Sequence, residues 1–221
     1  MNTKLLVAAS LLGAAGLAQA QQAGSVIVSL GGAQITPHVD SADLTAPSLV
    51  GTKIDVRKAS QVAGGITYFL SDAISIEIPL APPFKHEVVG AGAIQGVGVL
   101  GTVKALPATA IAQYRFGTSQ SLVRPFVGAG VTYAHFSHSR ATGTLSGITG
   151  GTPAKPTTLS MKSGFGPTLQ IGASANLTDR ISVEAGLTKT YLRTTGSLST
   201  GQTIETTLDP TSLKVCIGYR F

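Results

Sequence analysis

The residues that could carry out chemistry are few and widely spaced in this sequence. Four histidines are the obvious candidates for metal ligands, His38, His86, His135 and His138. His135 and His138 are three residues apart, however, which places them on opposite faces of a strand. The G-x-S-x-G turn of hydrolases and the H-E-x-x-H motif of zinc enzymes are both missing. We therefore predict that the protein is not an enzyme and that it holds no metal and no cofactor.

Isolated charges in strand-like segments indicate a structural chemistry instead. Glu77 and Glu184 each follow a predicted tight turn by a few residues, and Arg115 and Arg220 end predicted strands on the same side of the fold. Charges inside a folded protein need partners of opposite sign. We therefore predict that these four residues form one charge cluster in the interior. Its role is structural, closing one end of the fold, with a gate or a ligand contact as the alternative.

The end of the chain shows which kind of element positions these residues. In residues 213–221, large apolar side chains alternate with Lys214, Cys216, Gly218 and Arg220. Side chains of a strand alternate between its two faces, so this segment is predicted to be a strand with one large apolar face. The same alternation recurs in most other segments, and no convincing amphipathic helix is present to cover it. The simplest cover is lipid.

Eight such strands are predicted after the N-terminal segment. Their approximate ranges are 24–37, 56–70, 73–80, 103–116, 123–137, 161–176, 181–195 and 204–221. The connections alternate between long loops and short turns, and lipid cannot satisfy the open edge of a sheet. We therefore predict an all-β fold, an eight-stranded antiparallel transmembrane β-barrel of up-and-down topology, with short periplasmic turns and longer extracellular loops. The charge cluster then closes the periplasmic end of the lumen.

Composition supports a membrane protein and disfavours two other classes. Charged residues are only 12% of the chain, where a soluble domain has about a quarter. The net charge of +6 is scattered, with Arg57-Lys58 as the only adjacent basic pair, so no nucleic-acid partner is expected. A soluble lipocalin-like carrier would turn its apolar faces inward and leave the cluster charges outside. The single cysteine, Cys216, cannot form an intramolecular disulfide.

The N-terminal segment has the pattern of a secretory signal peptide. A short basic start at Lys4 precedes an apolar run over residues 5–17, and Ala18-Gln19-Ala20 has the small residues of a cleavage site. The apolar run is shorter than the ~20 residues that a transmembrane helix needs. We predict a signal peptide over residues 1–20 that is cleaved after Ala20, which leaves residues 21–221 as a barrel domain in the outer membrane of a Gram-negative bacterium.

Four spaced motifs resemble those of the OmpW family of outer-membrane proteins. They are APPFKH at 81–86, ALPAT at 105–109 followed by AQY at 112–114, RPFVGAGVTY at 124–133, and LDP at 208–210 with GYRF at 218–221. The resemblance implies an eight-stranded outer-membrane barrel with a narrow hydrophobic interior. It also implies passage of small hydrophobic molecules, with a sideways exit into the membrane. The terminal Phe221 resembles the signal recognised by the barrel assembly machinery.

Prolines mark a place where such an exit could form. Pro79, Pro82 and Pro83 lie at the upper end of the third predicted strand, and Pro107 lies in its neighbour. Proline has no backbone N–H group, so it weakens the pairing of adjacent strands. We predict a lateral opening at these four residues. The alternative is that they only end the strands and begin a loop.

Aromatic residues are predicted to lie at the two membrane interfaces. Members of the family that it resembles usually carry aromatic residues there and along the channel, but this sequence has no tryptophan. The predicted aromatic belt consists of Tyr68, Tyr114, Tyr133, Tyr191, Tyr219 and Phe221, with Phe69 and Phe116.

The function predicted from these features is that of a narrow channel or receptor for passive uptake of small hydrophobic molecules. Its expected partners are outer-membrane lipids, small hydrophobic molecules and the barrel assembly machinery. The alternative is a filled structural barrel that acts as a surface interaction protein, either an adhesin or a phage receptor.

Overall fold

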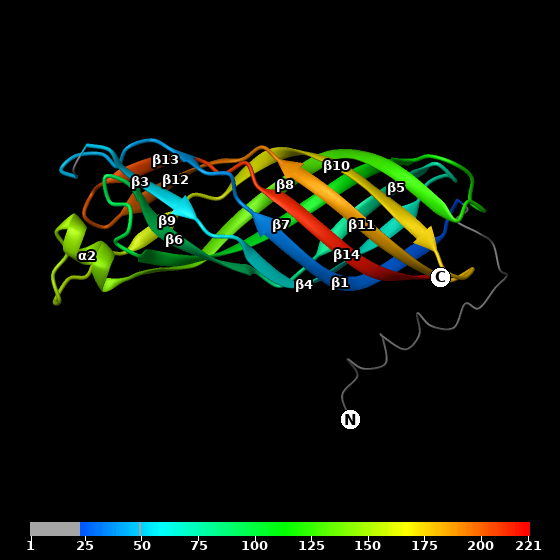
Figure 1. Cartoon of the computed structure of the whole chain (residues 1–221), viewed down its shortest axis with the longest axis horizontal. Helices are drawn as coiled ribbons and strands as arrows, with labels where there is room; N and C mark the ends of the chain where they lie inside the picture. Colours follow the sequence, from blue (N-terminus) through cyan, green and yellow to red (C-terminus); the bar gives the residue numbers. More distant parts are fainter. Residues whose placement is uncertain (1–22, 49) are drawn as a thin grey trace, which may run out of the picture.

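The computed structural model describes residues 23–48 and 50–221, so the predicted signal peptide lies outside the described residues. The fold is an elongated β-barrel whose strands cross its long axis at a slant (Figure 1). Eight strands form the barrel wall. They are β1 (Val26–Thr36), β4 (Ala59–Phe69), β5 (Ile74–Leu80), β7 (Val99–Arg115), β8 (Val123–Ala141), β10 (Gly164–Asn176), β11 (Ile181–Thr190) and β14 (Thr211–Arg220).

The barrel closes through antiparallel pairing all the way round. The strands follow the order β7-β5-β4-β1-β14-β11-β10-β8, and β8 then pairs with β7. The first and last strands pair along their whole length, from Ile27 with Arg220 to Thr36 with Thr211. Gly31 permits this pairing, because a Cβ atom there would lie 2.0 Å from the carbonyl oxygen of Val215. The predicted eight-stranded barrel is confirmed.

The apolar face of each strand points outward, as expected for a wall that contacts lipid. In β14, Ile217 is 61% exposed, whereas its neighbour Cys216 is 2% exposed. The same alternation holds in β5, where Ile76 and Ile78 are exposed and Glu77 is buried. Burying apolar groups away from water is favourable, so this outer surface belongs in a bilayer.

The two ends of the barrel differ. One end, which we call the turn end, carries the C-terminus and the short connections 70–73, 116–122 and 177–180 (Figure 1). The other, the loop end, extends the wall through β6 (Phe84–Gly92), which pairs with β7, and β3 (Thr52–Val56), which pairs with β6.

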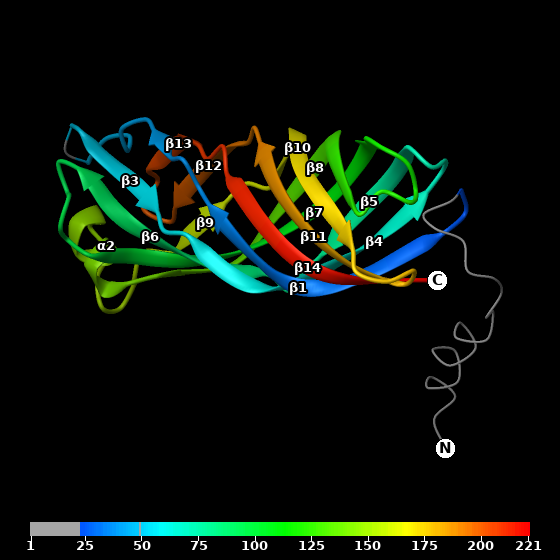
Figure 2. The same cartoon turned by 45° about the vertical axis from the view of Figure 1, so that its right-hand side comes forward.

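A second sheet forms one side of the loop end (Figure 2). Its strands, in spatial order, are β2 (Asp40–Ser41), β13 (Thr203–Thr207), β12 (Arg193–Leu198) and β9 (Leu159–Met161). Beside it lies the short helix α2 (Gly143–Thr149). A buried apolar cluster fills the space between them. It contains Leu44, Ile94, Leu100, Leu145, Leu198 and Ile204.

The loop end departs from the sequence-based expectations in three places. The connection between the predicted strands at 123–137 and 161–176 contains α2, which begins at the side-chain cap of Thr142 and ends at Gly150 with φ +80°. The connection between the predicted strands at 73–80 and 103–116 contains a further strand, β6, and the first residues of β7, which begins at Val99. The seventh predicted strand is divided, since β11 ends at Thr190 and the chain then enters the second sheet.

Among residues 23–48 and 50–221, no helix is both long enough and apolar enough to cross a membrane.

Candidate functional site

A network of buried polar side chains closes the lumen near the turn end. Its centre is Arg115, whose guanidinium lies between the rings of Phe69 and Phe126, at 5.2 and 4.6 Å from their centroids. Its Nη2 donates to Glu184 Oε2 at 2.8 Å and to Gln113 Oε1 at 2.8 Å. Its Nε donates to Ser75 Oγ at 3.3 Å and its Nη1 to Ser174 Oγ at 3.0 Å. The buried cation is therefore bonded on every nitrogen.

Glu77 is the second centre of this network. It is fully buried, and its Oε2 accepts hydrogen bonds from Nε2 of Gln113 at 2.7 Å and from Nε2 of Gln170 at 2.9 Å. Its Oε1 forms an ion pair with Lys214, whose Nζ also lies 3.4 Å from Glu184 Oε1. The bonds join five strands, β5, β7, β10, β11 and β14, across the lumen. We call this network the floor.

Three of the four predicted cluster residues, Glu77, Arg115 and Glu184, meet in the floor. Arg220 does not bond to them. It donates to the carbonyl oxygen of Asp179 at 2.6 Å and to Asn176 Oδ1 at 3.3 Å, closer to the turn end. The reason is its position at the end of β14, which aligns it with the β10–β11 turn rather than with the middle of the lumen.

Sequence reasoning missed Lys214, Gln113 and Gln170 as floor residues. Lys214 points inward by the same alternation as Arg220, but it lies six positions earlier on β14, opposite Gly186 and thus near Glu184. The strand register gives the height of Lys214 in the lumen, whereas the number of residues between Lys214 and a predicted turn does not. The two glutamines carry no charge, so the pairing of opposite charges does not point to them, although a buried amide also needs hydrogen-bond partners.

Above the floor lies an apolar cavity of about 140 Å³. Gln170, Lys214 and Ile111 border it from below. Its walls carry small and apolar side chains, among them Ala33, Ala63, Phe84, Val88, Val103, Ala105, Ala134, Phe136, Met161, Leu192 and Leu208. A smaller cavity of about 30 Å³ follows toward the loop end and shares Val88 and Met161 with the first. Apolar surface thus continues from the loop end down to the floor.

The strand pairing beside this cavity is interrupted. Within the described part of the chain, β5 pairs with β7 only from Ile74 with Tyr114 to Glu77 with Ile111. Pairing with β7 resumes at Phe84 with Ala105, after the chain has entered β6. Residues 78–83 therefore face residues 106–110 without ladder pairs. We call this interval the ladder gap.

All four predicted prolines lie in or beside the ladder gap. Pro79, Pro82 and Pro83 belong to one side of it and Pro107 to the other. Pro79 and Pro107 also line the cavity, as does Leu80. Leu80 is at the same time 52% exposed on the outside of the barrel, so the cavity reaches the wall here. That molecules leave through this gap stays a prediction at this point.

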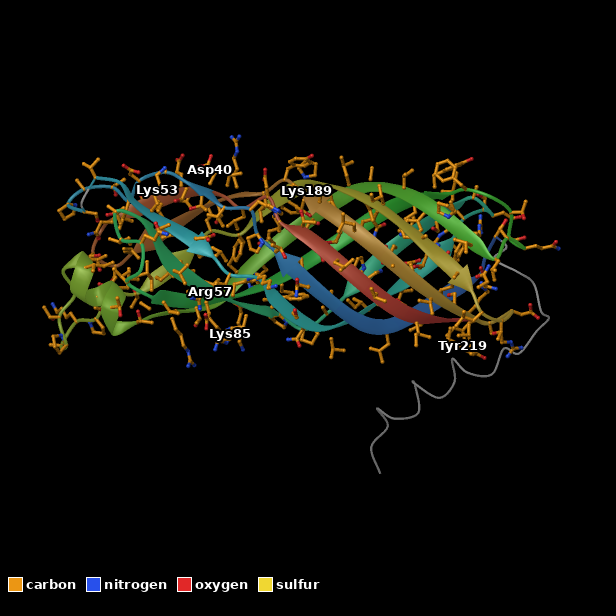
Figure 3. All side chains as sticks on the ribbon, viewed as in Figure 1. Asp40, Lys53, Arg57, Lys85, Lys189 and Tyr219 are labelled. Atoms are coloured by element: carbon orange, nitrogen blue, oxygen red, sulfur yellow. The ribbon has the colours of Figure 1, made fainter. Side chains whose placement is uncertain are left out.

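The predicted belt residues fall into two groups at different levels. Tyr68, Tyr114, Tyr219 and Phe221 are exposed near the turn end, where Tyr219 lies in Figure 3. Toward the loop end, Tyr133 contacts Phe165 with ring centroids 4.6 Å apart, and Tyr191 follows β11. The labelled charges Asp40, Lys53, Arg57 and Lys85 all lie in the loop-end half of the barrel (Figure 3).

Phe69 is a correction to the predicted belt. It is completely buried and packs against Arg115 inside the lumen. Its neighbour Tyr68 takes the outward position, and alternation then turns Phe69 inward.

The histidines do not come together. Among residues 23–48 and 50–221, no group of three or more His, Cys, Asp or Glu side chains is arranged to hold a metal. His86 is buried beside the cavity, on β6, between the water-exposed Lys85 and the half-buried Glu87. Burial lowers the pKa of His86, although the hydrogen bond of its Nδ1 with the carbonyl oxygen of Arg57, at 2.9 Å, acts in the opposite direction.

Comparison with known proteins agrees with this architecture. The chain is 30% identical to outer membrane protein W of Vibrio cholerae over 208 residues, 91% of each chain. It is similar to the crystal structure of the outer membrane protein OprG from Pseudomonas aeruginosa, with a TM-score of 0.80 and 25% identity over 91% of this chain and 97% of that one. The solution structure of Escherichia coli outer membrane protein W gives a TM-score of 0.56 and 27% identity, covering 90% and 99% of the two chains. The model of the OmpW family matches residues 22–221, and the chain therefore belongs to this family of outer-membrane proteins.

Proposed function

We propose that this protein is a passive conduit that takes small hydrophobic molecules from the outside and releases them sideways into the outer membrane. One observation carries the proposal. The apolar cavity ends below at a fully bonded polar floor and reaches the barrel wall at the ladder gap.

The physics of the site favours a sideways exit over straight passage. An apolar molecule that continued downward would have to displace Arg115, Glu77 and their partners, and leaving a buried charge unpaired costs several kcal/mol, about 3–5 by analogy with other buried pairs. Movement through the ladder gap instead keeps the molecule in mostly apolar surroundings and breaks no buried ion pair. No energy source is needed, because the membrane interior is itself the more favourable solvent. We accordingly propose a transport role without catalysis.

The proposal is tested by restoring the ladder. The double variant Pro79→Val/Pro107→Val supplies two backbone N–H groups and keeps the side chains apolar. Uptake of radiolabelled toluene, an apolar molecule small enough for a cavity of about 140 Å³, is followed in intact cells whose outer membrane contains the protein. We expect faster uptake with the natural protein than without it, and a loss of most of that increase in the variant.

A matched control replaces two prolines away from the gap. Pro153→Val/Pro156→Val changes exposed residues in the loop after α2 and should leave toluene uptake unchanged. In planar bilayers, we expect small ionic currents in all three proteins because the floor is intact. Toluene uptake that does not increase when the folded barrel is present would contradict the conduit and favour a surface interaction role for the loop end.

A further inference from the structure

A row of four threonine hydroxyl groups crosses the inner wall of the barrel just above the floor. Thr109 Oγ1 lies 2.9 Å from Thr132 Oγ1, which lies 2.7 Å from Thr168 Oγ1. Thr168 Oγ1 in turn lies 3.1 Å from Thr190 Oγ1. The row runs over four neighbouring strands, β7, β8, β10 and β11. We call it the hydroxyl row.

The hydroxyl row belongs to the cavity. Thr109, Thr132 and Thr190 line it, on a wall whose upper part is apolar. Thr109 also lies within residues 106–110, the β7 side of the ladder gap. A molecule that moves from the loop end toward the gap therefore passes an otherwise apolar surface and meets hydrogen-bonding groups at its lower end.

The chemistry of the row suits a neutral oxygen. Four hydroxyls joined by three hydrogen bonds use three of their four hydrogens, and the bonds can all run in either direction. The last hydrogen is thus at the Thr109 end in one direction and at the Thr190 end in the other. An end hydroxyl can donate to a carbonyl oxygen or accept from an alcohol, and neighbouring bonds in such a chain strengthen one another.

The floor beneath the row disfavours an anion. In the bonded network, the carboxylates of Glu77 and Glu184 offset the charges of Lys214 and Arg115, so no cation is left without a partner there. A carboxylate entering the cavity would lose its hydration and find no free positive charge. A pure hydrocarbon, in contrast, would leave the end hydroxyl without a partner.

We propose that the hydroxyl row is a subsite for the oxygen atom of a small neutral amphiphile, an alcohol or a ketone, whose hydrocarbon part lies in the apolar cavity. This inference rests on the proposed conduit and names the class of molecule it takes. A cavity of about 140 Å³ is close to the ~150 Å³ cavity known to bind benzene, so the ligand has about six to eight non-hydrogen atoms.

The experiment compares three probes of matched size in the full-length barrel reconstituted in lipid nanodiscs. The probes are 1-hexanol, n-heptane and hexanoate, and their binding is followed by NMR of labelled threonine methyl groups. Thr109→Val and Thr109→Val/Thr190→Val remove the end hydroxyls without changing the side-chain volume. Thr67→Val is the matched control, since Thr67 is buried in the same barrel but does not line the cavity. Heat-modifiable gel mobility verifies that each variant is folded.

We expect the natural protein to bind 1-hexanol more tightly than n-heptane or hexanoate. Loss of one hydrogen bond should weaken 1-hexanol binding about three- to ten-fold in Thr109→Val, and further in the double variant, while n-heptane binding is unchanged. Thr67→Val should alter neither. Equal effects on the alcohol and the alkane, or no effect on either, would overturn the subsite while n-heptane binding still supports the conduit. Tighter binding of hexanoate would overturn the preference for a neutral ligand, and absence of any binding would overturn both proposals.

Discussion

The lumen of this barrel is lined by opposite kinds of side chain in its two halves. Near the turn end, the lumen is filled by the floor, in which Arg115, Glu77 and Glu184 each have several bonded partners. Toward the loop end, the lumen is lined by apolar side chains, holds a cavity and has a ladder gap in its wall. An eight-stranded barrel is only just wide enough for either arrangement.

The rigid part of the barrel and the proposed passage therefore lie in different halves, the first near the turn end and the second toward the loop end. The floor links five strands through side chains, in addition to their backbone pairing, and so fixes the shape of the turn end. The cavity side relies on packing, which adapts more easily than a charge network. The comparison leads to three predictions on stability, given from the largest expected effect to the smallest.

The largest effect is expected from breaking the floor. Glu77→Leu leaves Lys214 with Glu184 as its remaining floor carboxylate and removes the acceptor of two glutamine side chains. Breaking a buried ion pair in this way costs about 3–5 kcal/mol of unfolding free energy. Urea unfolding of the barrel in lipid vesicles measures the loss.

The matched control is Glu87→Leu. Glu87 forms an ion pair with Arg57 at 2.8 Å, with side chains 42% and 59% exposed to solvent. Exposed pairs contribute less than about 1 kcal/mol. Similar losses in the two variants would show that the floor is no more stabilising than a surface pair.

An intermediate effect is expected from crowding the floor. A Cβ atom at Gly172 would lie 2.4 Å from Phe126 Cζ and 2.5 Å from the carbonyl oxygen of Ala185. Gly172→Ala must therefore shift the ring that supports Arg115, at a cost of about 1–3 kcal/mol. The cross-strand partner Gly186 is the natural control, because its nearest such contact is 3.7 Å. If Gly186→Ala destabilised the barrel as much as Gly172→Ala, the close fit around Phe126 would not be the cause.

The smallest effect concerns acid stability at the loop end. The pKa of His86 lies below its ordinary value of 6.5 because the ring is buried. Below pH 6.5 the unfolded chain therefore takes up a proton that the folded chain resists, and stability falls as the pH drops. His86→Asn keeps a donor for the Arg57 carbonyl oxygen but cannot titrate, so its unfolding free energy should fall less between pH 7 and pH 5.

Unfolding in urea at several pH values tests this. His38→Asn is the control, since His38 is exposed while its ring also contacts a backbone carbonyl, that of Asp209 at 3.3 Å. An identical pH dependence of the natural protein and His86→Asn would exclude His86 as a source of acid sensitivity.

The pattern of residue types is enough to predict the barrel and its location in a membrane. Alternation such as that of residues 213–221 gives each strand one apolar face, and the charges on the opposite face favour a barrel with that apolar face in lipid over a soluble carrier. The inward direction of Glu77, Arg115 and Glu184 followed from the same period. The positions of the prolines also predicted where pairing is weak, because a missing N–H group is a property of the residue itself.

Which inward residues meet depends on how the strands are aligned in three dimensions. Lys214 joins the floor and Arg220 does not, because the height of a side chain in the lumen depends on strand register and stagger, which alternation leaves open. The hydroxyl row depends on the same register, since its four threonines come from four different strands. The helix α2 and the second sheet at the loop end could likewise not be predicted from the sequence. They are short, and packing around Leu145 and Ile204 stabilises them rather than the secondary-structure propensity of their own residues.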